Sequence, residues 1–555
     1  MERLFSTHQV RISSEASPLW QLTTLDAGGA DKPLTVTVPG AWESQPGLRS
    51  YQGRAVYEQK LVCGGNVRFV FGGVGFRAVV RLDGQELCCH YGAYTAFDAI
   101  AENLPMGQHT LTVEADNRFG EDSALHIPND YYSYGGITRP VLVERLGDAY
   151  ITRIQVTPAQ TPEGWQADIR VWVRNLLDAP ASYHLRIDMP ELCGQGMPIR
   201  LQPREEGMVH CAVSCPDAVA WQPLAAKLYT VSAVLEKDGL PVDDLCDRFG
   251  FRQVTVEGRN ILINGEKVYL KGFNRHEDWG AFGCAVPLSA MQQDLAMMLD
   301  LGCNCVRTCH YPNDPLFLDL CDELGILVWE ESHARGLSEE RMRNPHFMEQ
   351  SVLCTEEMVT QHYNHPSIFI WGCLNECADD TEYGADCYRQ LYALLHRLDQ
   401  SRPVTAALLE RPGGRVYDAQ EVVSINIYPQ WYHMRPVDWQ IAAKREEIAA
   451  GGGGEKPLII SEIGAGAIYG FHDPLSRCKW TEERQCDILR GQIEAVFAEK
   501  AICGIFLWQF ADCRVTEEEW FDKRPLCLNN KGVVDEYRRP KMSYAVVKEL
   551  FTGKA

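Results

Sequence analysis

The sequence predicts two consecutive β-sandwiches followed by a closed (β/α)₈ barrel. The chain has 555 residues, too many for one ordinary core at roughly 150 residues per domain. Its first part shows closely spaced short strands, whereas strands alternate with helical segments from about residue 256. Hydrophobic residues make up 45% and charged residues 23%, a globular composition that argues against disorder.

The first 255 residues are predicted to contain strands and turns only. Residues 66–71 form an alternating run of the kind that half-buried strands show, and a second series includes residues 151–156 and 167–173. No helical period lies between these runs. Strands spaced this closely indicate two sandwiches, which we assign to residues 1–147 and 148–255.

The remainder, residues 256–555, contains eight apolar runs that we predict to be parallel strands. Helical patterns separate several of them, for example over residues 291–301, where Met291, Leu295 and Met298 share one face. Eight alternating strands and helices in about 300 residues imply a closed barrel. The predicted strands are Val268–Gly272, Cys303–Thr308, Ile326–Glu330, Ile368–Cys373, Pro403–Leu408, Val422–Ile427, Pro457–Ser461 and Gly504–Phe510.

Polar and aromatic residues follow these runs, at the barrel end where (β/α)₈ enzymes carry their active sites. A random distribution would place them at both ends of the barrel. In chain order they are Asn274, His276, His310, Glu331, Arg335, Asn375, Glu376, Tyr428, Glu462 and Trp508. Such a ring of acids, amides, imidazoles and aromatics is typical of a sugar-binding site.

Two glutamates in this ring suit the hydrolysis of an acetal. Glu376 follows strand four and Glu462 follows strand seven, and we expect these strands to face each other across the barrel. Glycoside hydrolysis needs one carboxylic acid to protonate the leaving oxygen and a second carboxylate near C1. The acid is expected to have the raised pKa. A single Glu after a strand is more often an ion-pair partner, but two at these positions are more specific.

Four barrel segments resemble glycoside hydrolase family 2, and the resemblance covers essentially the whole chain. They are Gly272–Glu277, Asn304–Pro312, Trp371–Glu376 and Ser461–Gly464. In the first half, Gly92–Phe97 resembles the family's N-terminal jelly-roll sandwich. Asp247–Arg252 resembles the connection from its immunoglobulin-like sandwich into the TIM barrel. The resemblance therefore implies these three architectures in this order.

The family resemblance also implies a role for several residues. Glu376 corresponds to the general acid/base and Glu462 to the nucleophile of a retaining enzyme, in which the two carboxyl groups lie about 5–5.5 Å apart. Asn375 corresponds to the residue that contacts the sugar 2-hydroxyl. His276 and His310 follow separate strands without metal-ligand spacing, so we expect sugar contacts from them, and neither a metal nor a cofactor.

Residues 525–532 identify the expected sugar class. They resemble the β-glucuronidase motif in which an Asn and a Lys, here Asn529 and Lys531, bind the C6 carboxylate. A buried sugar carboxylate requires a charged donor, because leaving it unpaired costs several kcal/mol. Asn-Asn-Lys-Gly is also good turn chemistry. Its position shortly after Trp508 at the end of strand eight favours the functional interpretation.

Three further residues match this type of site. Asp130 resembles an acid that the first sandwich contributes to the sugar pocket. Tyr428 and Tyr432 resemble the tyrosines near the nucleophile and the sugar carboxylate, although core packing is an equally good explanation for Tyr432.

Two positions depart from the glucuronidase pattern. Pro525 replaces an arginine that precedes the motif, with Arg524 one residue earlier. Arg335 replaces a small apolar residue after strand three, and an arginine directed into the pocket from there would contact the O4 hydroxyl, which would favour an axial O4. We therefore expect a retaining exo-β-D-hexuronidase acting on terminal β-linked glucuronic or galacturonic acid. β-Galacturonidase is an alternative main activity, and which of the two arginines contacts the sugar stays open.

Other classes fit the sequence less well. A β-galactosidase of the same family would have no use for Lys531, and a non-catalytic carbohydrate-binding protein would not need both glutamates. A net charge of −22 argues against nucleic-acid binding. No apolar run approaches the roughly 18–20 residues of a membrane span. Without a recognisable signal peptide, and with 21 scattered cysteines, we expect a cytoplasmic homo-oligomer acting on small-molecule or oligosaccharide uronides.

Overall fold

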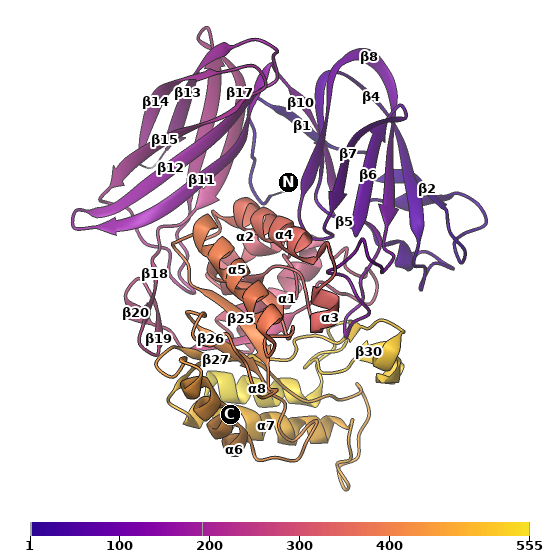
Figure 1. The fold of residues 1–555 in the computed structure, drawn as a ribbon, viewed down its shortest axis with the longest axis vertical. Helices are drawn as coiled ribbons and strands as arrows, with labels where there is room; N and C mark the ends of the chain where they lie inside the picture. Colours follow the sequence, from indigo (N-terminus) through magenta and orange to yellow (C-terminus); the bar gives the residue numbers. More distant parts are fainter. Residues whose placement is uncertain (1–2, 191, 554–555) are drawn as a thin grey trace.

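The computed structural model describes residues 3–190 and 192–553, and it has the predicted fold class. Two β-rich bodies lie side by side at the top of Figure 1, and the barrel lies below both. The first body and the barrel both contribute residues to the candidate active site, so the contact between these two bodies matters for its geometry.

The first body is built on one eight-stranded antiparallel sheet in the order β1-β10-β4-β8-β6-β7, with β2 paired to β4 and to β3. The long strands β4 and β8 pair along most of their length, with register shifts around Gly65. Both halves of β4 contribute to one buried cluster, for example through Tyr57 and Phe69. The strands are β1 (Ile12–Glu15), β2 (Leu19–Thr24), β3 (Leu34–Thr37), β4 (Arg54–Phe71), β6 (Arg77–Leu82), β7 (Gln85–Tyr91), β8 (Phe97–Asp116) and β10 (Val141–Leu146), and β5 (Val74–Gly75) pairs with β9 (Gly136–Ile137).

The second body is a sandwich of a three-stranded and a four-stranded antiparallel sheet. Their orders are β11-β12-β15 and β14-β13-β16-β17. Alternate residues of both sheets, such as Val171 and Leu235, meet in one core. The strands are β11 (Ala149–Thr161), β12 (Gly164–Asn175), β13 (Ala181–Met189), β14 (Cys193–Leu201), β15 (Glu206–Cys215), β16 (Tyr229–Lys237) and β17 (Leu240–Phe249).

A small sheet that the sequence did not reveal precedes the barrel. It consists of β18 (Val254–Glu257), β19 (Asn260–Ile263) and β20 (Glu266–Lys267). Ile261 and Ile263 belong to the same buried cluster as Leu270 and Cys305, near the starts of the first two barrel strands. The small sheet therefore packs on the barrel end opposite to the predicted site.

All eight predicted barrel strands are present, with shifts of a few residues at most. They close in parallel order from β21 to β28. The strands are β21 (Leu270–Arg275), β22 (Cys305–Thr308), β23 (Leu327–Glu331), β24 (Ile368–Asn375), β25 (Val404–Leu409), β26 (Val423–Asn426), β27 (Leu458–Ile463) and β28 (Ile502–Leu507). The helices are α1 (Leu288–Asp300), α2 (Pro315–Leu324), α3 (Glu339–Met342), α4 (Phe347–His362), α5 (Glu382–Leu398), α6 (Val437–Ala450), α7 (Glu482–Ala498) and α8 (Met542–Thr552).

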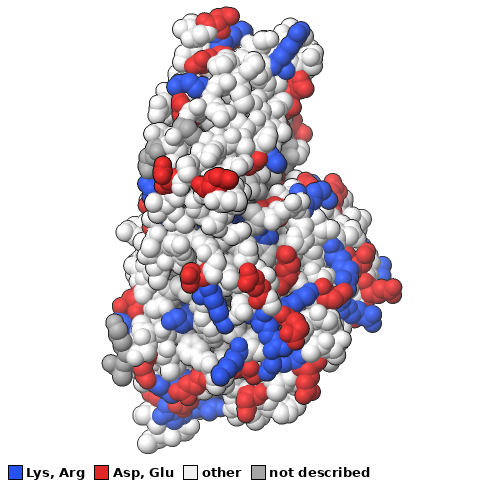
Figure 2. Space-filling model, turned by 90° about the vertical axis from the view of Figure 1, so that its left-hand side faces the viewer, with Lys and Arg blue, Asp and Glu red and all other residues white. Residues whose placement is uncertain are grey.

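The surface shows no segregation of charge on the side that Figure 2 presents, where acidic and basic side chains are interspersed. Within the described ranges, none of the helices is both long and apolar enough to cross a bilayer.

Candidate active site

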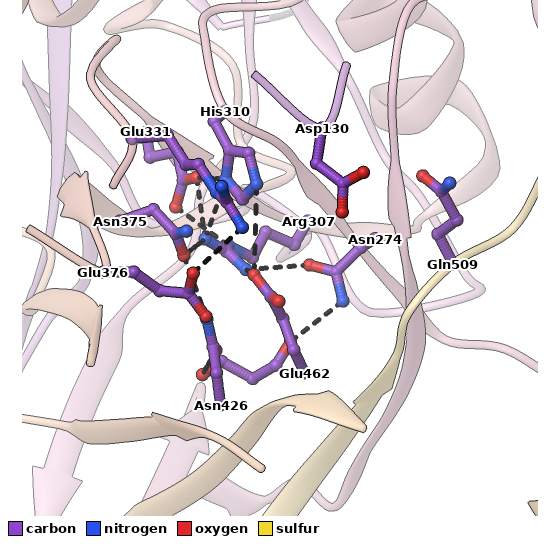
Figure 3. Close-up of polar contacts among 12 residues, drawn as sticks. Asp130, Asn274, Arg307, His310, Glu331, Asn375, Glu376, Asn426, Glu462 and Gln509 are labelled. Atoms are coloured by element: carbon purple, nitrogen blue, oxygen red, sulfur yellow. Dashed lines mark hydrogen bonds and ion pairs between the residues drawn. The ribbon is translucent and has the colours of Figure 1, made fainter. Parts of the chain in front are cut away.

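The two predicted catalytic glutamates lie at the carboxyl end of the barrel. Glu462 belongs to β27, and Glu376 directly follows β24. The expectation that their strands face each other was wrong in detail, because only β25 and β26 separate them on one side. Figure 3 shows both carboxyl groups directed into the same space beside Arg307. Glu376 has φ +52°, a strained conformation for a non-glycine residue of the kind that concentrates at functional sites.

Glu462 is buried and held by two donors. Arg307 Nη1 donates to Oε1 over 2.9 Å, and the Tyr428 hydroxyl donates to Oε2 over 2.7 Å. Burial, together with the charge of Glu376, raises the pKa of Glu462 to about 7, although Arg307 and Tyr428 act in the opposite direction. The raised pKa in the free pocket thus belongs to the predicted nucleophile.

Arg307, on β22, is the centre of the charge network (Figure 3). Its guanidinium is fully buried and donates to both oxygens of Glu331 over 2.8 Å. It also donates to Asn274 Oδ1 over 2.9 Å and to Asn375 Oδ1 over 2.8 Å. The residues in contact with Arg307 are thereby fixed relative to Glu462. We did not single out this arginine from the sequence, although an Arg inside an apolar strand signals a buried partner.

Glu376 makes two polar contacts on its own side of the pocket. Asn426 Nδ2 donates to Oε1 over 3.0 Å, and Arg335 Nη2 lies 3.0 Å from Oε2. Arg335 also donates to Asn129 Oδ1 over 3.0 Å. Arg335 therefore does point into the pocket, as the sequence suggested, but in this state it binds the predicted acid/base. A proton on Glu376, which a general acid requires, removes the negative charge that pairs with Arg335.

The opposite side of the pocket carries a buried ammonium group. Lys531 is 2% exposed, and its Nζ lies 5.6 Å from the ring centre of Tyr428 and 5.2 Å from that of Tyr432. Within the described part of the chain, Lys531 makes no ion pair with a carboxylate. Burial lowers its pKa. Tyr432 is 53% exposed and contacts this cation, so the core-packing explanation for it does not hold.

Asp130 reaches this side of the pocket from the first body. Arg524 Nε donates to Asp130 Oδ1 over 2.9 Å, and Nη2 donates to the other carboxylate oxygen. Arg524 also donates to the Tyr432 hydroxyl over 3.1 Å. The one-residue offset of this arginine from the family position therefore does not remove it from the pocket. Asn529 Nδ2 donates to the Asp130 carbonyl over 3.3 Å.

Several buried polar atoms in the pocket have no hydrogen-bond partner among the residues that the structure describes. They are Asn375 Nδ2, His276 Nε2, His310 Nε2 and Asn529 Oδ1. Trp508 stacks on His310 with ring centres 5.1 Å apart and packs edge-on against His276 at 5.4 Å. A ligand with many hydroxyl groups would satisfy these donors and acceptors while its carbon face packs on the indole.

The pocket thus brings together the residues that the sequence placed in the site, through one continuous set of contacts. It offers two adjacent carboxylates for acetal cleavage, hydrogen-bonding groups for hydroxyls and one cation for a carboxylate. Asn129, Asn274, Glu331 and Asn426 complete the contacts around them (Figure 3 shows the last three).

Comparisons with known proteins agree with this geometry. The model for "Glycosyl hydrolases family 2, TIM barrel domain" matches residues 254–554. The β-glucuronidase of Sus scrofa is 27% identical over 573 residues, covering 93% of this chain and 84% of the relative. Among solved structures, one similar to this chain is a family 2 β-galacturonidase from Eisenbergiella tayi bound to galacturonate. Its TM-score is 0.96 and its sequence identity is 48%, and the match covers 100% of this chain and 99% of that one.

A second solved structure is more distant. The Bifidobacterium dentium β-glucuronidase, complexed with coumarin-3-O-glucuronide, has a TM-score of 0.86 and 26% identity, covering 100% of this chain and 99% of that one. The family match extends over more than half of the chain, and the fold likeness over all of it. The family membership that the sequence suggested is therefore confirmed: the chain belongs to glycoside hydrolase family 2.

Proposed function

We propose that this enzyme is a retaining exo-β-D-hexuronidase that prefers β-galacturonides and also accepts β-glucuronides. The observation that carries the proposal is the buried Lys531, which has no carboxylate partner among the described residues. A buried cation without a partner is unfavourable, and a sugar carboxylate would pair with it. The similarity to β-glucuronidases and to a galacturonate-bound β-galacturonidase supports the same sugar class.

The proposed reaction uses the two glutamates in sequence. Glu376 gives its proton to the glycosidic oxygen while an oxygen of Glu462 attacks C1, and the bond from C1 to the leaving oxygen breaks. Glu376 then takes a proton from water, whose oxygen attacks C1 and releases the uronic acid. Two inversions at C1 restore the β configuration. Arg307 and Tyr428 hold Glu462 for attack through the contacts described above.

The preference for galacturonides rests on Arg335. This guanidinium is anchored to Asn129, the neighbour of Asp130, and loses its ion pair with Glu376 when that carboxylate is protonated. An axial O4 hydroxyl is the sugar group that we propose it then contacts. Glucuronides carry an equatorial O4, which would lack this contact. A β-galactosidase is disfavoured, because a neutral sugar leaves Lys531 unpaired.

Trapping of the glycosyl-enzyme tests the retaining mechanism. A 2-deoxy-2-fluoro uronosyl fluoride is expected to increase the mass of the protein by one sugar, and peptide mapping should place the sugar on Glu462. The Glu462→Gln variant should stay unlabelled. A label on Glu376 would contradict the assigned roles, and release of an α product detected by NMR would exclude retention altogether.

Replacement of Lys531 by Met tests the sugar class. Losing one partner of a buried ion pair costs about 3–5 kcal/mol, so kcat/KM for p-nitrophenyl β-uronides should fall by roughly 10²- to 10⁴-fold. Activity on the β-galactoside should not fall. Lys479→Met, which removes a cation stacked on Trp431, is the matched control and should retain uronide activity. A variant that loses galactoside but not uronide activity would support a β-galactosidase instead.

Replacement of Arg335 by Ala tests the sugar preference. A hydrogen bond to a charged group contributes about 1.5–3 kcal/mol, so kcat/KM for the galacturonide should fall by roughly 10- to 100-fold more than for the glucuronide. The ratio is the informative quantity, because loss of the contact with Glu376 affects both substrates. Arg335→Lys keeps the charge and should recover part of the preference. If Arg335→Ala leaves the ratio of kcat/KM for galacturonide to glucuronide unchanged, Arg335 does not determine the sugar preference.

The pKa of Glu462 predicts the acidic side of the pH profile. The nucleophile must be ionised, and its raised pKa means that kcat/KM falls as the pH drops through about 7. Tyr428→Phe removes a donor to the ionised form, so the midpoint should move to higher pH by about half to one pH unit. Tyr432→Phe, which has no contact with Glu462, should leave it in place. A midpoint that moves to lower pH in Tyr428→Phe would contradict this assignment.

A further inference from the structure

Three residues at the carboxyl ends of β21 and β22 form a cluster in the sugar pocket, and one of them, Cys309, has no role in the proposed hydrolysis. One nitrogen from each of His276 and His310 and the Sγ atom of Cys309 lie within 4.8 Å of one another. All three side chains are buried. We propose that they form a binding site for a thiophilic divalent cation such as Zn²⁺, and that the bound ion inhibits the enzyme by excluding the sugar.

The Nε2 atoms of both imidazoles, unpartnered among the described residues, support this site. His310 Nδ1 lies 2.8 Å from Glu331 Oε1, and His276 Nδ1 lies 3.2 Å from the Tyr311 hydroxyl. Both Nε2 atoms are buried without a partner. When Nδ1 of His310 donates to Glu331, Nε2 is left as an acceptor; Arg307 Nη2 also lies 3.3 Å from this Nδ1. Zinc-binding histidines in proteins are oriented by such carboxylates.

Glu462 lies near this cluster, although it is not among the residues whose ligand atoms are mutually within 4.8 Å. His310 Nε2 is 4.0 Å from Glu462 Oε1, and zinc forms bonds of about 2.0–2.2 Å to both nitrogen and carboxylate oxygen. Two imidazoles, one thiolate and one carboxylate make a set of the kind that binds zinc with four protein ligands. On binding, the thiol proton of Cys309 passes to solvent as the sulfur–metal bond forms. The ion would then occupy an oxygen of the proposed nucleophile.

The charges around the cluster tolerate a cation. Three carboxylates, those of Glu331, Glu376 and Glu462, surround the pocket with two guanidinium groups, those of Arg307 and Arg335. With Lys531 in the same pocket, the formal charges of these six groups sum to zero when all are ionised, and a thiolate at Cys309 would add one negative charge.

A second cluster of possible metal ligands differs from this one in its hydrogen bonding. Asp319, Asp322 and His365 also lie close enough together to hold a metal ion. There, however, Arg3 donates to both oxygens of Asp319 over 2.8–3.1 Å, and His365 Nδ1 bonds Asp322 over 2.6 Å. An internal guanidinium already satisfies that cluster. By contrast, the Nε2 atoms of His276 and His310 have no hydrogen-bond partner among the described residues.

Cobalt titration tests the site independently of turnover. Wild-type protein titrated with Co²⁺ should develop thiolate-to-cobalt charge-transfer absorption, which Zn²⁺ should then abolish by displacing the cobalt. Cys309→Ser should lack this absorption. Cys478→Ser, which removes an exposed thiol, is the matched control and should keep it. His276→Gln is a second variant that should weaken cobalt binding, and thermal melting of each variant checks that it is folded.

Inhibition by Zn²⁺ tests the consequence. Zn²⁺ should inhibit wild-type hydrolysis competitively with the uronide, and a chelator should restore activity. In Cys309→Ser the inhibition constant should rise at least on the order of 10- to 100-fold, the loss seen even when only an outer partner of a metal ligand is removed. Folded Cys309→Ser and His276→Gln proteins with the wild-type cobalt spectrum would overturn the metal site. A protein that hydrolyses no uronide but gives the expected spectra would overturn the proposed function alone.

Discussion

The buried guanidinium of Arg307 is the interaction on which the catalytic pocket depends. It joins Glu462 of β27 to Glu331 of β23, and also contacts Asn274 of β21 and Asn375 of β24. Two carboxylates this deeply buried would otherwise repel each other and favour protonation. One planar group with five donors satisfies them and fixes their geometry, which a lysine at this position would not do. The barrel strands supply the frame, and Arg307 sets the positions of the reacting groups within it.

Charge balance then explains how a general sugar pocket becomes selective. Arg307 neutralises buried carboxylates, Arg335 contacts Glu376, and Arg524 contacts Asp130. Lys531 differs from these arginines, because it has no carboxylate partner among the described residues: its ammonium group lies near the rings of Tyr428 and Tyr432 and has the Tyr432 hydroxyl as a hydrogen-bond partner. Aromatic faces stabilise a cation only modestly, by about 0.5–2 kcal/mol. The pocket is therefore built to receive one negative charge, at a place set by this lysine.

The sequence predicted what local patterns encode. The period-two pattern and the strand–helix alternation predicted the fold class and all eight barrel strands. The change from apolar to polar residues marks the end of each strand, and it predicted the positions of Glu376 and Glu462. The partners of the site were harder to predict. Asn129 and Arg335 are 206 residues apart, and Asp130 and Arg524 are 394 apart. No local periodicity in the sequence indicates that residues this far apart are in contact. The small sheet β18–β20 was missed because each strand has only two to four residues.

The loop that carries Asn129 and Asp130 links sugar binding to the docking of the first body on the barrel. Asn129 holds Arg335 through its side chain, and its backbone nitrogen bonds the Thr516 hydroxyl over 3.1 Å. A sugar that contacts groups on both sides of this junction binds only the docked arrangement. Because linked equilibria are reciprocal, such a sugar must also tighten the docking by the same free energy. Sugar selectivity is then a property of a domain interface, and sequence changes far from the glutamates can alter it by shifting how the two bodies meet.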